Sequence, residues 1–413
     1  MNTRVVVTGM GTVNPLGLTV AESWDHVTRG ISGVGPITLF DASDMQVRIA
    51  CEVPGFDPAR YMEAREARRR DRFEQFATAS MQEAVSQAGL DFKGEDPERV
   101  AVIVSSAIGG IHSIQEAIMT MVTEGPRRIS PFAIPMLMSN GAAGLIAIDL
   151  GARGPCFSVA SACAAAADGI GQAWLLIRAG VVDVAIAGGS EAPITRIGVS
   201  AFDRLGALSR RSDDFSQTPA PFDRERDGLV MGEGAALLVL ESLEHARARR
   251  APILAELAGY AATADAFHVT APAEDGAGGA TAIEAALRSA GLTPSEVDYI
   301  NAHGTGTTLN DISETRAIKR ALGEHAYRVP VSSTKSMTGH MMGATGALEA
   351  IFCVQAIRTG VVPPTIHYHT PDPECDLDYV PNQARQRPVR VALSNAFGFG
   401  GHNAVLVFCH YSD

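Results

Sequence analysis

The sequence has little charge and few aromatic residues. Only 19% of its 413 residues are charged and 6% are aromatic, whereas 46% are hydrophobic. A hydrophobic content this high excludes a disordered chain and predicts a large, well-buried globular core. The formal net charge of −12 argues against nucleic-acid binding, because a nucleic-acid-binding surface needs an excess of positive charge.

The cysteines show no metal-binding or redox spacing. No CxxC motif occurs, and the six residues stand apart at Cys51, Cys156, Cys163, Cys353, Cys375 and Cys409. This pattern gives no zinc signature and is typical of a reducing cytoplasm. The chain begins MNTRVVVTGMG, which has the pattern of a strand and not of a signal peptide. We therefore expect a cytoplasmic protein.

Long hydrophobic runs are also scarce. The one candidate, residues 157–177, contains a single charge, Asp168, and approaches the length of a membrane span. Ser158, Ser161, Gln172 and two glycines interrupt its apolar character. We expect this segment to be a buried core helix without membrane contact.

Cys163 lies within that same stretch. Residues 157–160 have the pattern of a strand, and four alanines after Cys163 favour a helix that ends near Gly180. On the first turn of such a helix, a thiol faces free backbone N–H groups and the positive end of the helix dipole. This position favours a thiolate and an oxyanion. A lone cysteine is more often a small core residue, so the rest of the chain must supply its partners.

Two halves of the chain resemble each other. MQEAVSQAGL at 81–90 resembles IEAALRSAGL at 283–292, and a strand-like segment follows each. IRAGVVD at 177–183 matches IRTGVVP at 357–363, an offset of 180 residues. These repeats predict a duplicated α/β unit, in which the helix that opens at Cys163 has a counterpart beginning near residue 343.

The duplication has a chemical consequence. If the halves pack about a pseudo-twofold axis, the starts of the paired helices meet. His340, three residues before Gly343, should then approach Cys163. His303 follows the repeated strand of the second half, and the ends of parallel strands are common ligand sites. The sequence therefore predicts one cysteine and two histidines in one place.

Three further segments are rich in glycine and small polar residues. They are NAHGTGT at 301–307, KSMTGH at 335–340 and NAFGFGGHN at 395–403. Asp311 and Glu314 have the spacing of an N-terminal capping box for the helix after the first of these segments. We therefore expect these two carboxylates to be structural.

Together with the Cys163 segment, these motifs in this order resemble the elongating condensing enzymes of the thiolase superfamily, most closely the beta-ketoacyl-acyl-carrier-protein synthases of type II. The likeness covers essentially the whole chain. Initiating synthases carry Cys-His-Asn, so His340 favours the elongating branch. The resemblance implies a duplicated thiolase-like α/β fold, layered α-β-α-β-α, with two mixed sheets around buried helices. Its halves would span 1–250 and 251–413.

The resemblance also implies an activity. This is the decarboxylative condensation of malonyl-carrier protein with an acyl-enzyme thioester, which extends fatty acyl chains by two carbons in fatty acid biosynthesis. Cys163 would hold the acyl chain, and the backbone N–H groups of Cys163 and Phe399 would form the oxyanion hole. His303 and His340 would promote decarboxylation and stabilise the enolate. No cofactor is required.

Further sites follow from the same resemblance. Lys335 and Glu349 match a buried charged pair that orients the histidines. The implied substrate-binding residues are Ile108, Phe202, Thr270, Thr305, Thr307 and Phe399. A structural monovalent cation would bind at Asn301, Ala302, Glu349, Ser394 and Asn395.

The implied partners are a second copy of the chain, giving a homodimer, and an acyl-carrier protein in its acyl and malonyl forms. Carrier proteins are acidic, and this chain is acidic too, so docking requires a local basic patch. The candidates are Arg65, Arg68, Arg69, Arg127 and Arg128, with Arg72, Arg204 and Arg210 beside them.

Three other functions share part of this pattern. A ketosynthase of a polyketide or specialised-lipid pathway would carry the same catalytic residues. A non-catalytic chain-length partner subunit would lack the nucleophilic cysteine, which is present here. A papain-like hydrolase also pairs a cysteine with a histidine, but its flanking signature does not occur. Ala133 stands where type II enzymes commonly have phenylalanine, which leaves the preferred chain length open.

Overall fold

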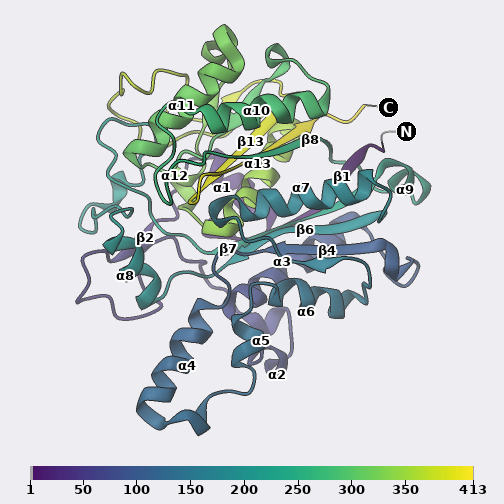
Figure 1. Ribbon diagram of the computed structural model, residues 1–413, viewed down its shortest axis with the longest axis vertical. Helices are drawn as coiled ribbons and strands as arrows, with labels where there is room; N and C mark the ends of the chain where they lie inside the picture. Colours follow the sequence, from purple (N-terminus) through teal and green to yellow (C-terminus); the bar gives the residue numbers. More distant parts are fainter. Residues whose placement is uncertain (1–2, 413) are drawn as a thin grey trace.

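The computed structural model describes residues 3–412 and contains one large sheet that folds back on itself (Figure 1). Its ten strands are hydrogen bonded in the order β10-β9-β13-β14-β8-β1-β7-β6-β4-β5. In chain order they are β1 (Val5–Val13), β4 (Val100–Ser105), β5 (Cys156–Phe157), β6 (Val184–Glu191), β7 (Gly234–Ser242), β8 (Ala255–Ala264), β9 (Tyr299–Asn301), β10 (Val331–Ser332), β13 (Val391–Gly398) and β14 (His402–Cys409).

The two halves of this sheet have the same topology. The order β5-β4-β6-β7-β1 corresponds strand by strand to β10-β9-β13-β14-β8. In each half the first three strands are parallel and the remaining pairings are antiparallel. This confirms the predicted duplication.

The halves are joined by a short antiparallel contact between β1 and β8. Val6 lies opposite Glu256, and Val7 lies opposite Ala255. The two mixed sheets that the sequence predicts are thus linked in a single hydrogen-bonded ladder. The predicted division of the chain into 1–250 and 251–413 stays a prediction.

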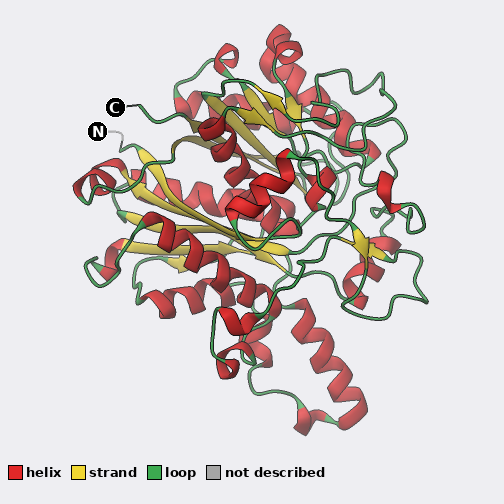
Figure 2. Ribbon diagram, turned by 180° about the vertical axis from the view of Figure 1, so that it is seen from behind, coloured by secondary structure: helices red, strands yellow, loops and turns green. Residues whose placement is uncertain are grey.

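Helices form three layers around the two half-sheets (Figures 1 and 2). Helices α3 (Arg72–Ala88) and α6 (Gly141–Leu150) cover the outer face of the first half, and α10 (Ala277–Ala290) and α11 (Thr308–Leu322) cover that of the second. Helices α7 (Ala165–Arg178) and α13 (Thr345–Thr359) pack between the half-sheets. The layering is the expected α-β-α-β-α.

The central helices are buried because their sequences are small and apolar. A Cβ added at Gly346 of α13 would lie 3.2 Å from Ala167 of α7, so the two helices touch closely. The core helix expected within 157–177 is thereby confirmed. Between residues 3 and 412, no helix is long and apolar enough to cross a membrane. The strand expected at 157–160 is wrong in extent, since β5 pairs only with β4 at the sheet edge and ends at Phe157.

The remaining helices and strands lie around this core. The helices are α1 (Val20–Thr28), α2 (Ala64–Ala67), α4 (Ile111–Glu124), α5 (Ala133–Leu137), α8 (Arg196–Arg204), α9 (Leu243–Ala248) and α12 (Lys335–Thr338). Two small ladders pair β2 (Gly35–Pro36) with β3 (Ile49–Ala50) and β11 (Val361–Val362) with β12 (Arg385–Gln386). Helices α4 and α5 form an arm that projects from the first half, at the bottom of Figure 1.

Candidate active site

Two turns with the same backbone lie at the centre of the molecule. The turn at 162–164 leads into α7, and the turn at 342–344 leads into α13, at the predicted offset of 180 residues. Each contains a non-glycine residue in the left-handed region, Ala162 at φ 51° and Met342 at φ 45°. Cys163 lies in the first of these turns, two residues before α7 begins and not on its first turn as the sequence predicts.

Gly343, the counterpart of Cys163, allows close packing of the second turn. A Cβ at this position would lie 2.4 Å from the backbone nitrogen of Ala107 and 2.6 Å from the Glu191 carboxylate. That carboxylate accepts the backbone N–H groups of Gly343 at 3.0 Å and of Ala107 at 2.7 Å. The turn that follows His340 is thereby fixed against the loop after β4.

His303 enters the site from the loop after β9. Its backbone N–H and that of Gly304 donate to Glu314 at 2.8 and 2.7 Å. Asp311 accepts the backbone N–H of Phe222 at 2.7 Å. Both carboxylates lie inside α11, so the predicted capping box is wrong. Backbone N–H groups of neighbouring loops donate to the oxygens of both carboxylates. Glu314 thereby fixes the position of His303.

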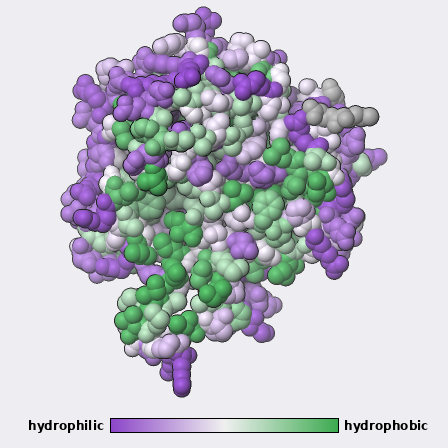
Figure 3. Space-filling view, viewed as in Figure 1, coloured by the Kyte–Doolittle hydropathy of each residue, from purple (hydrophilic) through white to green (hydrophobic). Residues whose placement is uncertain are grey.

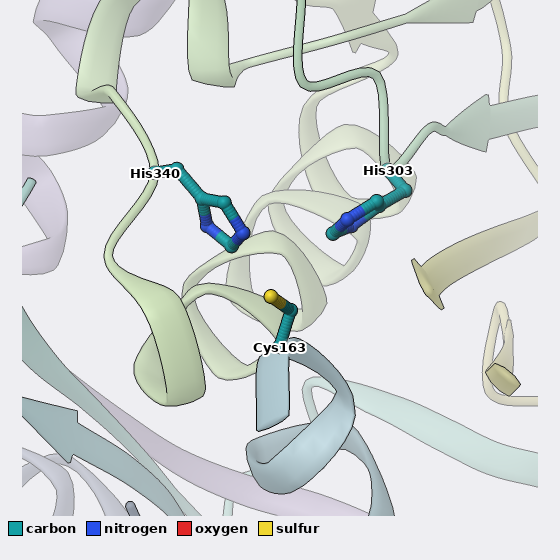
Figure 4. A group of neighbouring side chains, drawn as sticks. All are labelled: Cys163, His303 and His340. Carbon is teal, nitrogen blue, oxygen red and sulfur yellow. The ribbon is translucent and has the colours of Figure 1, made fainter. Parts of the chain in front are cut away.

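The three predicted residues converge (Figure 4). One ligand atom from each of Cys163, His303 and His340 lies within 4.8 Å of the other two. The histidine rings are nearly perpendicular, at 84°, with centroids 5.3 Å apart. Such a cluster has the spacing of metal ligands, and it equally suits proton transfer to and from a thiol.

The two histidines are buried with free nitrogens. His340 places Nδ1 2.9 Å from the Thr345 hydroxyl, whereas its Nε2 and the Nδ1 of His303 have no hydrogen-bond partner. Burial and the nearby positive charge of Lys335 lower the pKa of both imidazoles well below its usual value. Both rings are therefore neutral near neutral pH.

The Cys163 thiol departs from the sequence-based expectation. Burial raises its pKa to about 11, although the backbone N–H of Phe399 and the charge of Lys335 oppose this shift. Loss of hydration thus outweighs the effect of the helix start, and the resting residue is a thiol. Attack by sulfur therefore requires that its proton be removed as substrate binds.

Lys335 and Glu349 form the expected buried ion pair. The Lys335 Nζ lies 2.5 Å from Glu349 Oε1, and both side chains are 1% exposed. Burial raises the pKa of Glu349 to about 7, and the Lys335 charge limits this rise. The pair places a positive charge beside both imidazoles, which keeps them unprotonated.

A cavity of about 350 Å³ leads to these residues. Of the predicted substrate-binding residues, Phe202, Thr270, Thr305, Thr307 and Phe399 line it. The rings of Phe202 and Phe399 stack at 6.4 Å beside Cys163.

Ile108 does not line this cavity. Its backbone N–H donates to the carboxylate of Glu191 at 3.2 Å, which places it beside the His340–Gly343 turn. Its predicted contact with the acyl chain stays a prediction.

Thr345 and Glu191, which hold the site in shape, and Met342 of the cavity wall are not predicted from the sequence. Glu314 is expected to be structural, but its bond to the His303 backbone is not predicted. Only the 180-residue offset, which marks position 342 as the counterpart of 162, could have pointed to one of them.

The predicted cation-binding residues are buried, and one of them, Glu349, belongs to the ion pair with Lys335. Ser394 of β13 lies opposite Asn301 of β9 in the parallel ladder. Three of the oxygens, Glu349 Oε2, Ser394 Oγ and Asn395 Oδ1, have no hydrogen-bond partner. Hard cations bind oxygen ligands of this kind, so the residues fit a small cation.

Only some arginines of the predicted basic patch are exposed and, within residues 3–412, free of a structural partner in the fold. Arg65, Arg68, Arg127, Arg128 and Arg204 are exposed. Arg69 is half-buried, with its guanidinium 4.5 Å from the centre of the Phe132 ring. Arg72 binds the buried carboxylate of Glu233 at 2.6 Å, and Arg210 binds Asp203 at 3.0 Å. Arg72 is thus structural, because a buried carboxylate needs a charged partner.

Comparisons with known proteins agree on one family over both halves of the chain. The model described as "Beta-ketoacyl synthase, N-terminal domain" matches residues 2–246, and that described as "Beta-ketoacyl synthase, C-terminal domain" matches residues 254–369. The 3-oxoacyl-[acyl-carrier-protein] synthase 2 of Synechocystis sp. is 50% identical over 408 residues, which is 99% of this chain and 98% of the relative. That of Staphylococcus aureus is 48% identical over 407 residues, 98% of each.

Solved structures show the same relationship. The ishigamide ketosynthase/chain length factor matches with a TM-score of 0.94 and 38% identity, over 100% of both chains. A structure described as "type II PKS acyl-carrier protein in complex with its ketosynthase bound to the hexaketide" matches with a TM-score of 0.92 and 37% identity, again over 100% of both chains.

Proposed function

This chain belongs to the beta-ketoacyl synthase family and is an elongating condensing enzyme, and on that premise we propose that Cys163, His303 and His340 perform its chemistry. The enzyme is an acyltransferase of fatty acid biosynthesis, a 3-oxoacyl-acyl-carrier-protein synthase. The observation that carries the residue assignment is the convergence of one thiol and two neutral imidazoles at one cavity.

In the first step the Cys163 sulfur attacks the thioester carbonyl of an acyl-carrier protein. A neutral imidazole accepts the thiol proton as the S–C bond forms, because the free thiol has a pKa of about 11. The backbone N–H groups of Cys163 and Phe399 donate to the oxyanion. The carrier thiolate leaves and takes up the proton, so an acyl-cysteine remains.

In the second step malonyl-carrier protein occupies the same cavity. Its C–CO₂ bond breaks, carbon dioxide leaves, and the electron pair forms an enolate that His303 and His340 stabilise by hydrogen bonds. The enolate carbon attacks the acyl-cysteine carbonyl, and the C–S bond breaks. The Cys163 thiolate that leaves takes up one proton, which solvent water supplies, and the product is a 3-oxoacyl-carrier protein two carbons longer.

The carrier protein docks on the exposed arginines of the predicted basic patch, namely Arg65, Arg68, Arg127 and Arg128, with the half-buried Arg69 among them. Opposite charge steers and orients such a partner. A family relative is described in complex with its acyl-carrier protein, which supports this partner class. Inside the cavity, hydroxyls of Thr270, Thr305 and Thr307 can bind the pantetheine arm.

The enzyme acts as a homodimer, in which a second copy covers an apolar surface. Figure 3 shows hydrophobic residues gathered over the α4–α5 arm. Monomeric proteins rarely expose such patches. Its exposed members are Ile114, Ile118, Met119, Met121, Val122, Ile134 and Met138.

The reaction requires no redox or metal cofactor, since no atom changes hands with an oxidant or reductant and the thiol, the imidazoles and one solvent proton complete each step. A monovalent cation at Asn301, Ala302, Glu349, Ser394 and Asn395 would neutralise the orphaned oxygens and stiffen the loop before His303. The cytoplasm is the proposed compartment, supported by six cysteines that are all free thiols.

A ketosynthase role in a polyketide or specialised-lipid pathway is the second candidate. The observation that favours it is the similarity to the ishigamide ketosynthase/chain length factor, at 38% identity. Both pathways would use the same residues and would differ in the acyl group that is loaded.

Mass analysis of the acyl group on Cys163 tests both the assignment and the pathway. The enzyme is incubated with a mixed pool of acyl-carrier proteins and digested. Saturated acyl groups on the Cys163 peptide support fatty acid elongation, whereas an oxygenated or unsaturated chain supports the second candidate. Absence of any acyl group from Cys163 would contradict both.

A further inference from the structure

Asp168 is a buried charge that the proposed reaction does not use. It is the only charged residue within 157–177 and is 8% exposed. The Ser161 hydroxyl donates to its Oδ2, and the Tyr260 hydroxyl donates to its Oδ1 at 2.7 Å. Burying a carboxylate in an apolar helix is unfavourable unless its hydrogen bonds compensate. The position therefore calls for a role beyond packing.

The partners of Asp168 come from separate parts of the molecule. Ser161 lies two residues before Cys163, whereas Tyr260 belongs to β8 of the second half. Gly171, one turn along α7 from Asp168, makes room for the aromatic ring, because a Cβ there would lie 2.4 Å from Tyr260. Asp168 thus links the turn that carries Cys163 to strand β8 of the second half.

His402, on the strand that follows Phe399, lies near enough to influence the charge of Asp168. Burial raises the pKa of Asp168, and the hydrogen bonds from Ser161 and Tyr260 and the nearby His402 oppose the rise. His402 begins β14, and its ring lies 3.0 Å from where a Cβ of Gly400 would be. The carboxylate therefore lies between the Cys163 turn and the strand that leaves the Phe399 loop.

The residue between Ser161 and Cys163 is strained. Ala162 has a φ of 51°, a conformation that a non-glycine residue keeps only where its surroundings fix it. In the equivalent turn of the second half, Glu191 accepts the N–H directly after the strained Met342. In the first half, the hydrogen bond from Ser161 to Asp168 holds Ser161, which directly precedes the strained Ala162. Each turn is thus fixed by one buried carboxylate.

The same turn supports the chain segment that carries Phe399. A Cβ at Gly398 would lie 3.0 Å from the backbone nitrogen of Cys163 and 3.0 Å from the carbonyl oxygen of Ser161. A shift of Ser161 would therefore displace both the sulfur and the two N–H groups assigned to the oxyanion hole.

We propose that Asp168 is a positioning residue, which holds Ser161 and so keeps the strained turn in the conformation that presents Cys163 to the thioester. This inference rests on the proposed role of Cys163 as the acyl carrier. Asp168 itself contacts neither the substrate nor the reacting atoms. Its loss should slow acyl transfer to sulfur without weakening carrier docking.

The test compares Ser161→Ala and Asp168→Asn with the parent and with Ser23→Ala. Ser23 is a matched control, since its buried hydroxyl donates to Thr19 at 2.7 Å and it does not line the cavity. Single-turnover acylation of Cys163 by an acyl-carrier protein is followed by mass spectrometry, together with KM and the melting temperature. Ser161→Thr, which keeps the hydroxyl, tests rescue.

We expect acylation to slow by about 10- to 100-fold in Ser161→Ala and Asp168→Asn, because small displacements of a nucleophile have effects of this size. KM should stay near the parent value, and Ser161→Thr should recover most of the rate. Ser23→Ala should lower the melting temperature only. If Asp168→Asn does not fold, Ser161→Ala decides, since the carboxylate then keeps its bond from Tyr260.

If Cys163 is acylated as fast in Ser161→Ala as in the control Ser23→Ala, the proposal is overturned and Asp168 has only a structural role. Absence of acylation in the parent itself would instead contradict the proposed role of Cys163. The two failures are therefore distinguishable.

Discussion

Cys163 and Gly343 occupy equivalent positions in two turns of the same conformation, one in each half of a duplicated fold. One half supplies the sulfur, and the other supplies a glycine that a side chain could not replace without clashing with Ala107 and Glu191. His340 precedes that glycine by three residues and reaches the sulfur of the first half. The two similar halves thus form one shared centre, to which each contributes different side chains.

Cys163 should rest as a neutral thiol and not as part of a thiolate–imidazolium pair, so that only the small thiolate fraction is alkylated. Its pKa of about 11 predicts that the rate of alkylation by iodoacetamide rises about tenfold per pH unit between about pH 7 and 9. Peptide mapping at limiting reagent should find Cys163 labelled before the deeply buried Cys51. A rate that is flat over this range would show that the thiolate already exists at pH 7.

Replacing His303 or His340 with alanine should stop condensation while some acylation of Cys163 remains. Loss of a hydrogen-bond donor to the enolate and of a proton acceptor should lower the condensation rate by at least about 100-fold. The measurement is carbon dioxide release from malonyl-carrier protein beside acyl-enzyme mass. Equal loss of both reactions in a folded variant would contradict the division of roles.

Thr345 should matter through His340, because its hydroxyl lies 2.9 Å from Nδ1. Thr345→Val should lower condensation by about tenfold, and Thr345→Ser, which keeps the hydroxyl, should retain the parent rate. Thermal unfolding provides the control for packing. If Thr345→Ser is as slow as Thr345→Val, the lost methyl or shape, and not the hydrogen bond, is responsible.

Charge reversal at Arg68 and Arg127 should affect carrier-bound substrates only. The double variant to glutamate should raise KM for the carrier protein several-fold and flatten its salt dependence, whereas activity on a small pantetheine thioester should be unchanged. Arg288→Glu is the matched control, since Arg288 is exposed on the outer helix α10. Equal losses on both substrates would assign these arginines to the fold.

Enlarging Ile108 should restrict chain length. Ile108→Phe is expected to oppose long acyl groups by about 1–3 kcal/mol of overpacking while short groups still load. Acylation by hexanoyl- and dodecanoyl-carrier protein is compared in parent and variant. Because Ile108 lies outside the observed cavity and bonds to Glu191, proportional loss for both chains would make it a packing residue.

Stability should depend on another buried carboxylate, Glu241, which does not line the cavity. Burial alone would raise the pKa of Glu241, but hydrogen bonds from Arg249, His245 and Thr8 outweigh it and lower the pKa to about 2. The stabilisation is complete above the unfolded pKa of about 4.3 and is lost as pH falls towards 2. Glu241→Gln should therefore cost about 3 kcal/mol at neutral pH and less in acid, by urea unfolding. A cost independent of pH would contradict the ionised pair.

Much of the site could be predicted because short motifs and an internal repeat can be recognised in the sequence alone. The repeat at an offset of 180 residues brings His340 to Cys163 before any coordinates are known. What could not be predicted depends on contacts between distant segments. Asp311 and Glu314 match a capping box, yet loops from elsewhere bind their oxygens. The helix start favours a Cys163 thiolate, yet burial, which no local pattern reports, decides the pKa.

The central claim is that Cys163 carries the acyl group between two carrier-bound substrates. A pulse with labelled acyl-carrier protein, removal of free carrier, and a chase with malonyl-carrier protein tests it directly. The account predicts label on the Cys163 peptide after the pulse, and its transfer after the chase to a 3-oxoacyl product two carbons longer. Product formation without label on Cys163, or in Cys163→Ala, would contradict it.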